Sequence, residues 1–236
     1  MLRYRIAGLN VEMDPKYPTL LKQGVPYLHD FSGEADIVVD FPPSFYEEKH
    51  KLHPELPMDS CEYLWMGFGV YRKLVNFGGF VLHASALAYQ GRAYLFSAPC
   101  GTGKSTHTGL WQQAFGDEVI ILNDDKPALR KIDGVFHAFG TPFSGKTDKN
   151  VNMGVPLGGI CVLEQSKENW IRPVSGRDAI LPLYHQTMRP PDAKNMDLLL
   201  GLLEELIQQV PVYRMGCNIS LDAARLARDT MQGGLR

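Results

Sequence analysis

Residues 93–106 read AYLFSAPCGTGKST, and the order of residue types in this segment is enough to indicate an architecture. An apolar run that suits a buried strand leads into a loop with two glycines, which is followed by Lys104, Ser105 and a predicted helix. Glycines let backbone amides approach a phosphate closely, and the N-terminus of the next helix adds N–H groups and the positive end of its dipole. In such a loop the lysine reaches the β- and γ-phosphates of a nucleotide and the hydroxyl binds Mg²⁺. The segment therefore predicts a P-loop.

The predicted nucleotide-binding residues extend over the whole loop. A full P-loop pattern begins with glycine, and Ala98 stands at that position here. The rest of the pattern, Gly-x-Gly-Lys-Ser, is intact. The residues expected to contact the nucleotide are Ala98, Pro99, Cys100, Gly101, Thr102, Gly103, Lys104, Ser105 and Thr106.

The motif Asn123-Asp124-Asp125, with its acidic pair, directly follows the apolar run at residues 119–122. A carboxylate at the end of a buried strand beside a P-loop is placed to bind Mg²⁺. Two adjacent carboxylates also indicate divided roles, one on the metal and one as the base that accepts a hydroxyl proton, because their repulsion raises one pKa. The sequence leaves open which aspartate has which role, and a solvated turn is the alternative interpretation.

Two further candidates carry less specific patterns. His83 shares one face of a predicted strand with Val81 and Ser85. A lone histidine in such a strand is more often a core residue. Residues 140–146, GTPFSGK, form a polar loop bracketed by glycines. Such a loop either contacts a substrate or is a surface turn, and composition alone favours the turn.

The rest of the chain mixes helices and strands. A strand is expected over residues 80–89, turning at residues 90–91 into the strand before the glycine loop, and further strands over residues 119–122 and 155–163. Helices are expected to start at the caps Asp59 or Ser60, after Thr106, at Asn195 and at Ser220. Short strands and loops are expected in the first sixty residues. This mixture indicates an α/β fold, with α+β as the alternative, around a mixed central sheet flanked by helices.

Composition excludes several classes of protein. The chain of 236 residues holds 24 Lys and Arg against 26 Asp and Glu, a net charge of −2, which argues against nucleic-acid binding. No apolar run approaches the ~18–20 residues that span a bilayer, and no signal-peptide core follows the N-terminus. We expect a cytoplasmic protein away from the membrane, with four reduced cysteines. Residues 1–58 are expected to form a small β-rich region packed on a core of residues 59–236, in one compact unit.

In their order along the chain, His83, the glycine loop and the Asp124-Asp125 pair resemble the HPr kinase/phosphorylase family. The fold of that family is similar to the nucleotide-binding core of phosphoenolpyruvate carboxykinases. The resemblance covers residues 80–163 and implies that His83 lies near the acidic pair and tunes it, with one aspartate as base and the other on the metal. Short HPr-kinase-like proteins also carry a GTP-F/W-x-G loop after the double Asp, which implies that Thr141, Ser144, Gly145 and Lys146 line the active site.

The expected function is a kinase that uses ATP, or another nucleotide, with Mg²⁺ to phosphorylate a serine-like hydroxyl of a protein, peptide or small molecule. Its catalytic residues would be His83, Lys104, Asp124 and Asp125, with Ser105 and the aspartates on the metal. Arg130, Arg172 and Arg189 are candidates for a cation on the transferred group. Two alternatives are a non-catalytic nucleotide-binding regulator and a P-loop hydrolase. The acceptor, the phosphoryl donor and assembly into a homo-oligomer are left open.

Overall fold

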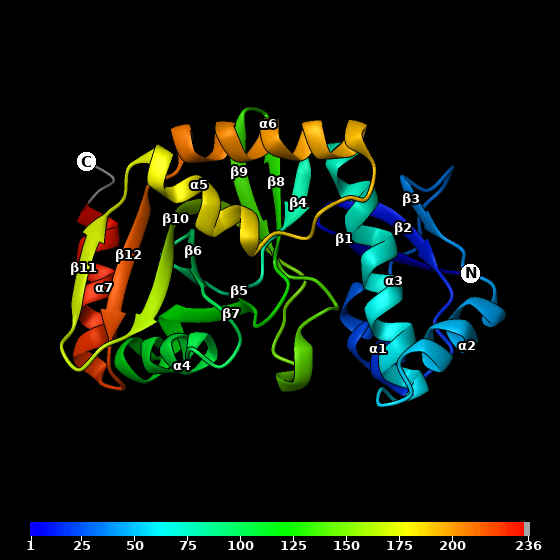
Figure 1. Cartoon of the computed structure of the whole chain (residues 1–236), viewed down its shortest axis with the longest axis horizontal. Helices are drawn as coiled ribbons and strands as arrows, with labels where there is room; N and C mark the ends of the chain where they lie inside the picture. Colours follow the sequence, from blue (N-terminus) through cyan, green and yellow to red (C-terminus); the bar gives the residue numbers. More distant parts are fainter. Residues whose placement is uncertain (234–236) are drawn as a thin grey trace.

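A nine-stranded mixed sheet forms the centre of this computed structural model, which describes residues 1–233 (Figure 1). Seven strands follow the order β4-β8-β9-β10-β6-β5-β7; β12 pairs with β10, and β11 with β12. The predicted α/β class, a mixed sheet flanked by helices, is confirmed. The strands are β4 (Gly79–Val81), β5 (Ala84–Tyr89), β6 (Arg92–Ser97), β7 (Val119–Asn123), β8 (Ala128–Ile132), β9 (Val135–Phe139), β10 (Gly154–Gln165), β11 (Trp170–Pro173) and β12 (Val212–Cys217).

The long strand β10 joins two parts of the sheet. Its first residues, 154–156, pair antiparallel with β9, whereas residues 160–165 pair in parallel with β12. Along its other edge β10 runs parallel to β6. The strands β6, β10 and β12 therefore share one direction, and their carboxyl ends meet at the edge of the sheet where the glycine loop begins.

Helices bury both faces of the sheet. Helices α4 (Lys104–Phe115) and α7 (Leu221–Gly233) cover one face, where the fully buried ring of Trp111 stacks on Tyr94 and contacts Phe96. Helices α5 (Gly176–His185) and α6 (Ala193–Gln209) cover the other. The leucines of α6 that recur at helical spacing, Leu199, Leu203 and Leu206, are fully buried there. Each such side chain stabilises the fold by about 1.5–3 kcal/mol.

Residues 1–57 form a second, smaller sheet with two helices, and this N-terminal region packs against α3 (Met58–Leu74) (Figure 1). The elements of the region are β1 (Leu2–Ile6), β2 (Leu9–Met13), α1 (Pro18–Gln23), β3 (Ile37–Val39) and α2 (Pro43–Leu52). Short 3-10 helices cover Val25–Tyr27, Val75–Phe77, Gly116–Glu118 and Gly145–Thr147. The region shares a hydrophobic core with α3 that includes Val11, Leu20, Ile37 and Val70.

Helix α2 corrects the expectation of only strands and loops in the first sixty residues. Pro43 stands at the first helical position, where its missing N–H is not needed and its fixed φ suits a helix. The prolines at residues 42 and 43 thus start a helix and do not merely mark a loop.

Three local predictions also differ from the structure. Helix α3 begins at Met58 after Pro57, with no side-chain cap, and the Asp59 carboxylate instead accepts hydrogen bonds from Thr19 of α1. The cap of α6 is Asp192, whose side chain accepts from the backbone N–H of Asn195. The expected strand over residues 80–89 is broken, since residues 79–81 pair with β8 and residues 84–89 with β6 and β7. The predicted cap Ser220 does accept from the N–H of Ala223.

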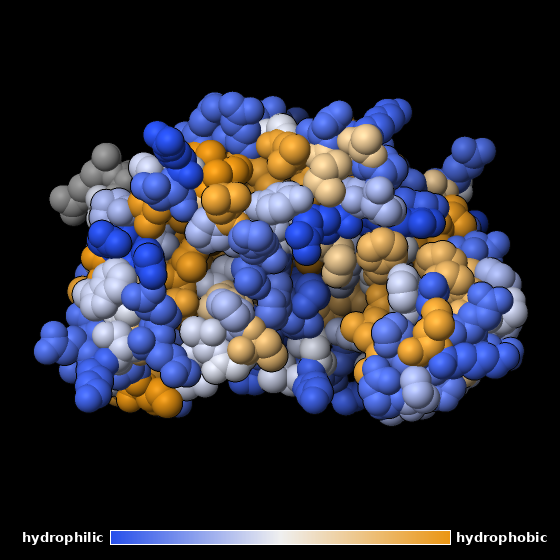
Figure 2. All heavy atoms as spheres, in the orientation of Figure 1, coloured by the Kyte–Doolittle hydropathy of each residue, from blue (hydrophilic) through white to orange (hydrophobic). Residues whose placement is uncertain are grey.

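The surface is mixed in character. On the face shown in Figure 2, hydrophobic residues gather over α6, where Leu198 and Leu200 are exposed. Within residues 1–233, none of the helices combines the length and the apolar character that a bilayer crossing requires.

Candidate functional site

The glycine loop between β6 and α4 adopts a conformation that only glycine reaches easily. Gly101 and Gly103 have φ angles of +79° and +111°, in the left-handed region. A Cβ at either position would meet nothing within 4 Å, so the glycines are needed for their backbone angles and leave open space above the loop. No side chain caps α4, which starts at Lys104. Its first N–H groups therefore remain available at the loop.

Lys104 lies folded into this loop. Its side chain is buried, and Nζ donates to the carbonyl oxygens of Ala98 at 2.9 Å and Pro99 at 3.4 Å. Burial lowers the pKa of Lys104, and Lys126 lowers it further, whereas Cys100 and the two aspartates oppose the change. Carbonyl oxygens are weak partners for an ammonium group. A bound anion can therefore replace them.

Asn123 sets the turn that carries the acidic pair. Its side-chain oxygen accepts from the N–H groups of Asp125 and Lys126, and its amide donates to Thr141. This turn points the Asp124 side chain into the protein, where the residue is 7% exposed. Its Oδ1 accepts a hydrogen bond from the Ser85 hydroxyl at 2.5 Å. The other oxygen, Oδ2, is buried and has no hydrogen-bond partner among residues 1–233.

Asp125 takes a more open position beside His83. Its Oδ1 lies 2.7 Å from Lys126 Nζ and 3.4 Å from His83 Nε2. The Gln186 side chain contacts His83 Nδ1 at 2.9 Å and holds the ring in place. Burial lowers the pKa of His83, as do Lys126 and Lys104, while Asp125 and Gln186 raise it. The break between β4 and β5, where His83 stands, thus places an imidazole of lowered pKa beside the Asp125 carboxylate.

Residues of the N-terminal region and of α3 hold the loop at residues 140–150 by hydrogen bonds and an ion pair. The Gln23 amide donates to the Gly145 carbonyl at 3.1 Å, and the Gly145 N–H donates to the Tyr63 hydroxyl at 2.8 Å. Tyr27 donates to Asn150 at 2.9 Å, and Lys22 pairs with Asp148. These contacts bring Gly145 so close to Asp125 that a Cβ there would lie 3.1 Å from Asp125 Cβ.

One cavity of about 520 Å³, the central cleft, brings together His83, both aspartates, part of the glycine loop and part of the GTPFSGK loop. Ala98, Pro99 and Thr102 of the predicted nucleotide-binding loop do not line it. Thr141 is fully buried beneath that loop, where its hydroxyl donates to the Lys126 carbonyl, and it does not line the cleft. The lining residues are His83, Cys100, Gly101, Gly103, Lys104, Ser105, Thr106, Asp124, Asp125, Ser144, Gly145, Lys146 and Thr147.

A second cavity of about 560 Å³, the N-terminal cavity, adjoins the cleft. The two share Asp125, Gly145 and Lys146. Its other walls are α1, with Thr19, Lys22 and Gln23, and the segment around the start of α3, with Leu56, Ser60, Tyr63 and Leu64. Asp125 therefore faces both cavities.

Comparison with known proteins identifies the family. Residues 58–221 match the family model described as SynChlorMet cassette protein ScmC, which is well over half of the chain. The chain belongs to the ScmC family. No curated protein matches the ScmC chain in sequence. A solved structure, the Hpr(Ser) kinase/phosphatase from Coxiella burnetii, matches with a TM-score of 0.39 and 11% identity, over 66% of the ScmC chain and 99% of the other chain.

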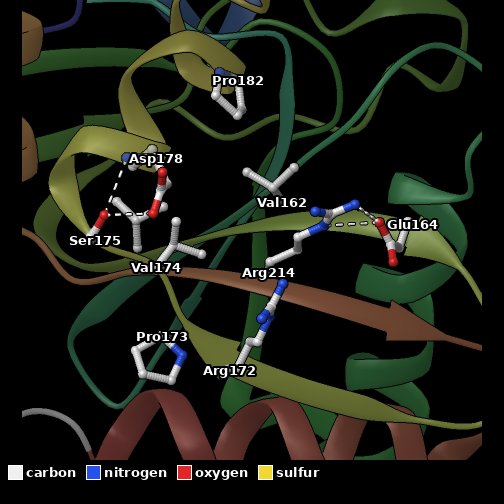
Figure 3. A pocket seen from close by; sticks show the side chains of 11 residues that line it. Val162, Glu164, Arg172, Pro173, Val174, Ser175, Asp178, Pro182 and Arg214 are labelled. Carbon is white, nitrogen blue, oxygen red and sulfur yellow. Dashed lines mark hydrogen bonds and ion pairs between the residues drawn. The ribbon is translucent and has the colours of Figure 1, made fainter.

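The three arginines suggested by the sequence lie away from the central cleft. Arg130 donates to the carbonyls of Phe77 and Ala7, and Arg189 lies over the Tyr184 ring. Arg172, on β11, lines a separate pocket of about 480 Å³ on the face of the sheet that α5 covers. Figure 3 shows Arg214, another arginine of that pocket, turned toward Glu164. The two form an ion pair, so the charge of Arg214 is already matched. Among residues 1–233, the basic side chains that line the cleft besides His83 are those of Lys104 and Lys146.

The donor set of the ScmC cleft fits a magnesium ion. Mg²⁺ binds oxygen ligands and takes only one or two from protein when phosphate oxygens and water supply the rest. Asp124, Asp125 and Ser105 line one cavity and carry such oxygens, and Asp124 Oδ2 has no hydrogen-bond partner among the described residues. Residues 1–233 contain no cluster of three or more His, Cys, Asp and Glu that could hold a metal by itself.

Four residues of the ScmC site had no signal in the sequence. Gln186 holds His83, while Gln23, Tyr27 and Tyr63 position the GTPFSGK loop and its neighbour Asn150. Gln186 stands 103 residues from His83, and Gln23 stands 122 from Gly145. No motif spacing reveals partners this far apart.

Proposed function

We propose that this ScmC protein is a kinase that binds a nucleoside triphosphate with Mg²⁺ and transfers the γ-phosphoryl group to a hydroxyl. The observation that carries the proposal is the buried, unpartnered oxygen of Asp124 in the same cleft as the glycine loop and Lys104. A buried charged oxygen without a partner costs stability, and a bound cation would satisfy it. The motifs shared with HPr kinases support the same reading.

The glycine loop would hold the phosphates. No side chain caps the start of α4, and a Cβ at Gly101 or Gly103 would meet open space. Lys104 would leave the carbonyls of Ala98 and Pro99 and donate to phosphate oxygens, which carry full charge and bind an ammonium more strongly. Asp124 and Ser105 would hold Mg²⁺, which supplies positive charge to the phosphates and keeps them oriented.

Asp125 would be the base. Because it lines both the central cleft and the N-terminal cavity, an acceptor in that cavity can bring its hydroxyl to Asp125 while the γ-phosphate lies on the other side. Asp125 takes the hydroxyl proton, and the hydroxyl oxygen forms a bond to the γ-phosphorus. The bond from that phosphorus to the bridging oxygen breaks, and its electron pair leaves with the nucleoside diphosphate. The neutral His83, 3.4 Å from Asp125, can then receive the proton.

Calorimetric titration with Mg-ATP tests the binding part of this proposal. Lys104→Ala should weaken binding by about a hundredfold, because it removes the one buried cation of the loop. Lys149→Ala is the matched control, since that side chain is exposed and only its backbone carbonyl, to Asp124 N–H, is used. Unchanged affinity in Lys104→Ala contradicts the assignment.

Release of the γ-phosphate, to water or to an added acceptor, tests the chemistry. Asp125→Asn should keep Mg-ATP affinity and lose release, since an amide cannot accept the proton. If wild-type protein binds Mg-ATP without releasing phosphate to any acceptor, it is a nucleotide-binding regulator. Release that goes only to water indicates a hydrolase.

A further inference from the structure

A third cavity adjoins the glycine loop on the side opposite Asp124. This strand-end pocket has a volume of about 410 Å³ and shares Gly101, Gly103 and Thr106 with the central cleft. One wall is the loop and α4; the other is the segment after β10 and the segment after β12. Its lining residues are Gly101, Thr102, Gly103, Thr106, His107, Leu110, Gln165, Ser166, Cys217, Asn218 and Ile219.

The topology explains why a pocket forms here. The strands β6, β10 and β12 are parallel, and each ends at this edge of the sheet. In α/β sheets, ligands bind in the crevice beyond the carboxyl ends of the strands. The acidic pair lies at one side of the loop, at the end of β7, and the strand-end pocket at the other. A molecule held at the loop by its phosphates can therefore extend away from the acidic pair into this pocket.

His107 in the wall of the pocket has an unused hydrogen-bond donor. Its side chain is 2% exposed, and its Nε2 accepts from the indole N–H of Trp111 at 3.3 Å. Because indole nitrogen only donates, Nε2 carries no proton, and the neutral ring bears its hydrogen on Nδ1. This Nδ1 is buried and has no partner within the described part of the chain. An unpaired buried donor is rare in native structures and indicates that an acceptor is missing.

The two walls together offer apolar contact. Ile219 is 82% exposed, far more than is usual for isoleucine, and Leu110 of α4 lines the same pocket. Two amide side chains in this wall already make hydrogen bonds: Gln165 donates to the Thr102 carbonyl, and Asn218 donates to Lys167 and accepts from Ser220. The pocket thus offers an apolar surface together with the buried, unpartnered His107 Nδ1. A flat ring with apolar faces and an acceptor at its edge matches this combination.

We infer that the strand-end pocket binds the nucleoside part of the nucleotide, with the base between Leu110 and Ile219 and His107 Nδ1–H donating to a base nitrogen or a ribose oxygen. The inference rests on the proposed function for the phosphates and adds the site for the rest of the molecule. It makes the pocket, rather than the loop, the place where a nucleotide is distinguished from a bare polyphosphate.

Two probes separate the pocket from the loop. ATP carries both the nucleoside and the phosphates, and inorganic tripolyphosphate carries the phosphates alone. Titrations of each, with Mg²⁺, are compared for wild type, His107→Leu and Ile219→Ala. Leucine is close to histidine in volume and has no donor, and Ile219→Ala changes only an exposed side chain. Leu181→Ala, on α5 and 62% exposed, is the matched control for Ile219→Ala.

The expected result is that wild type binds ATP more tightly than tripolyphosphate. Each variant should weaken ATP by about fivefold, the size of one hydrogen bond or one buried apolar contact. Tripolyphosphate affinity should not change in either variant, and Leu181→Ala should change nothing. Equal losses for ATP and tripolyphosphate, or no loss for ATP in Ile219→Ala, overturn the inference. A Lys104→Ala variant that still binds tripolyphosphate overturns instead the assignment of the loop, so the two failures are distinguishable.

Discussion

The substitution Asp124→Asn should make the free protein more stable and remove its response to magnesium. Asp124 is 7% exposed, and one of its two carboxylate oxygens has no partner among the described residues. An unsatisfied buried acceptor costs about 1–3 kcal/mol, and the cost is higher for a charged group than for a neutral amide. Lys104 attracts the carboxylate and offsets part of the cost.

The net gain expected for Asp124→Asn is therefore about 1 kcal/mol, since the amide oxygen still accepts from Ser85. For a chain of this length that gain raises the melting temperature by about 2–4 °C. Bound Mg-ATP, in contrast, should stabilise wild type more than the variant. At a hundred times its dissociation constant, Mg-ATP stabilises wild type by about 2.7 kcal/mol. The variant should gain no more from Mg-ATP than from ATP with EDTA.

Thermal unfolding in three conditions measures both effects: no ligand, ATP with EDTA, and ATP with Mg²⁺. Asp133→Asn is the control, because Asp133 is exposed in the turn between β8 and β9 with a φ of +49°, which asparagine tolerates. Metal-free ATP should bind Asp124→Asn at least as well as wild type, since one negative charge is gone. If the variant melts below wild type without ligand, or responds equally to magnesium, the metal assignment of Asp124 is wrong.

Three further outcomes follow from the structure. Burial lowers the pKa of His107 from 6.5 to about 4, so between these pH values the unfolded chain binds more protons than the folded one. The contribution of the neutral ring to stability is therefore complete above pH 6.5 and is lost as the pH falls, by about 2–3 kcal/mol at pH 4.5. Urea unfolding of wild type and of His107→Leu across this pH range measures the loss. Gly103→Ala should destabilise by about 1–2 kcal/mol, because alanine at a φ of +111° is strained, and calorimetry should also detect weaker ATP binding. Glu62→Gln should cost about 2 kcal/mol, because the fully buried carboxylate accepts from the N–H groups of Lys16 and Tyr17 and an amide turns a donor toward one of them; a melting temperature within 2 °C of wild type would count against that role.

Local patterns predicted the parts of the site that depend on neighbouring residues. The glycine loop, Lys104 and the acidic pair are set by short-range geometry, and these groups do line one cleft. The turn at residues 90–91, with positive φ at both positions, was likewise readable from Gln-Gly between two apolar runs. Each of these features can be recognised from a stretch of fewer than about twenty residues.

Features decided by distant partners could not be predicted. Asp59 is a good helix cap by composition, but Thr19, 40 residues earlier, takes its carboxylate. His83 was expected within one continuous strand, but it lies in the break between β4, which pairs with β8, and β5, which pairs with β6. Thr141 lies in the expected loop, yet its hydroxyl donates a hydrogen bond to the Lys126 carbonyl and does not face the cleft. In each case a contact made in the folded chain outweighs the local preference.

The hold of the N-terminal region on the GTPFSGK loop has a consequence for synthesis on the ribosome. Residues 1–57 are made first, but Gln23, Tyr27 and Ala7 bond to Gly145, Asn150 and Arg130. These partners arrive only after about 70–90 more residues, or roughly 4–20 s of translation. Helix α3 is made directly after the N-terminal region, so their shared core can begin to form early, but the contacts to the loop cannot. Slower translation would lengthen the interval in which this part of the N-terminal region has no partner.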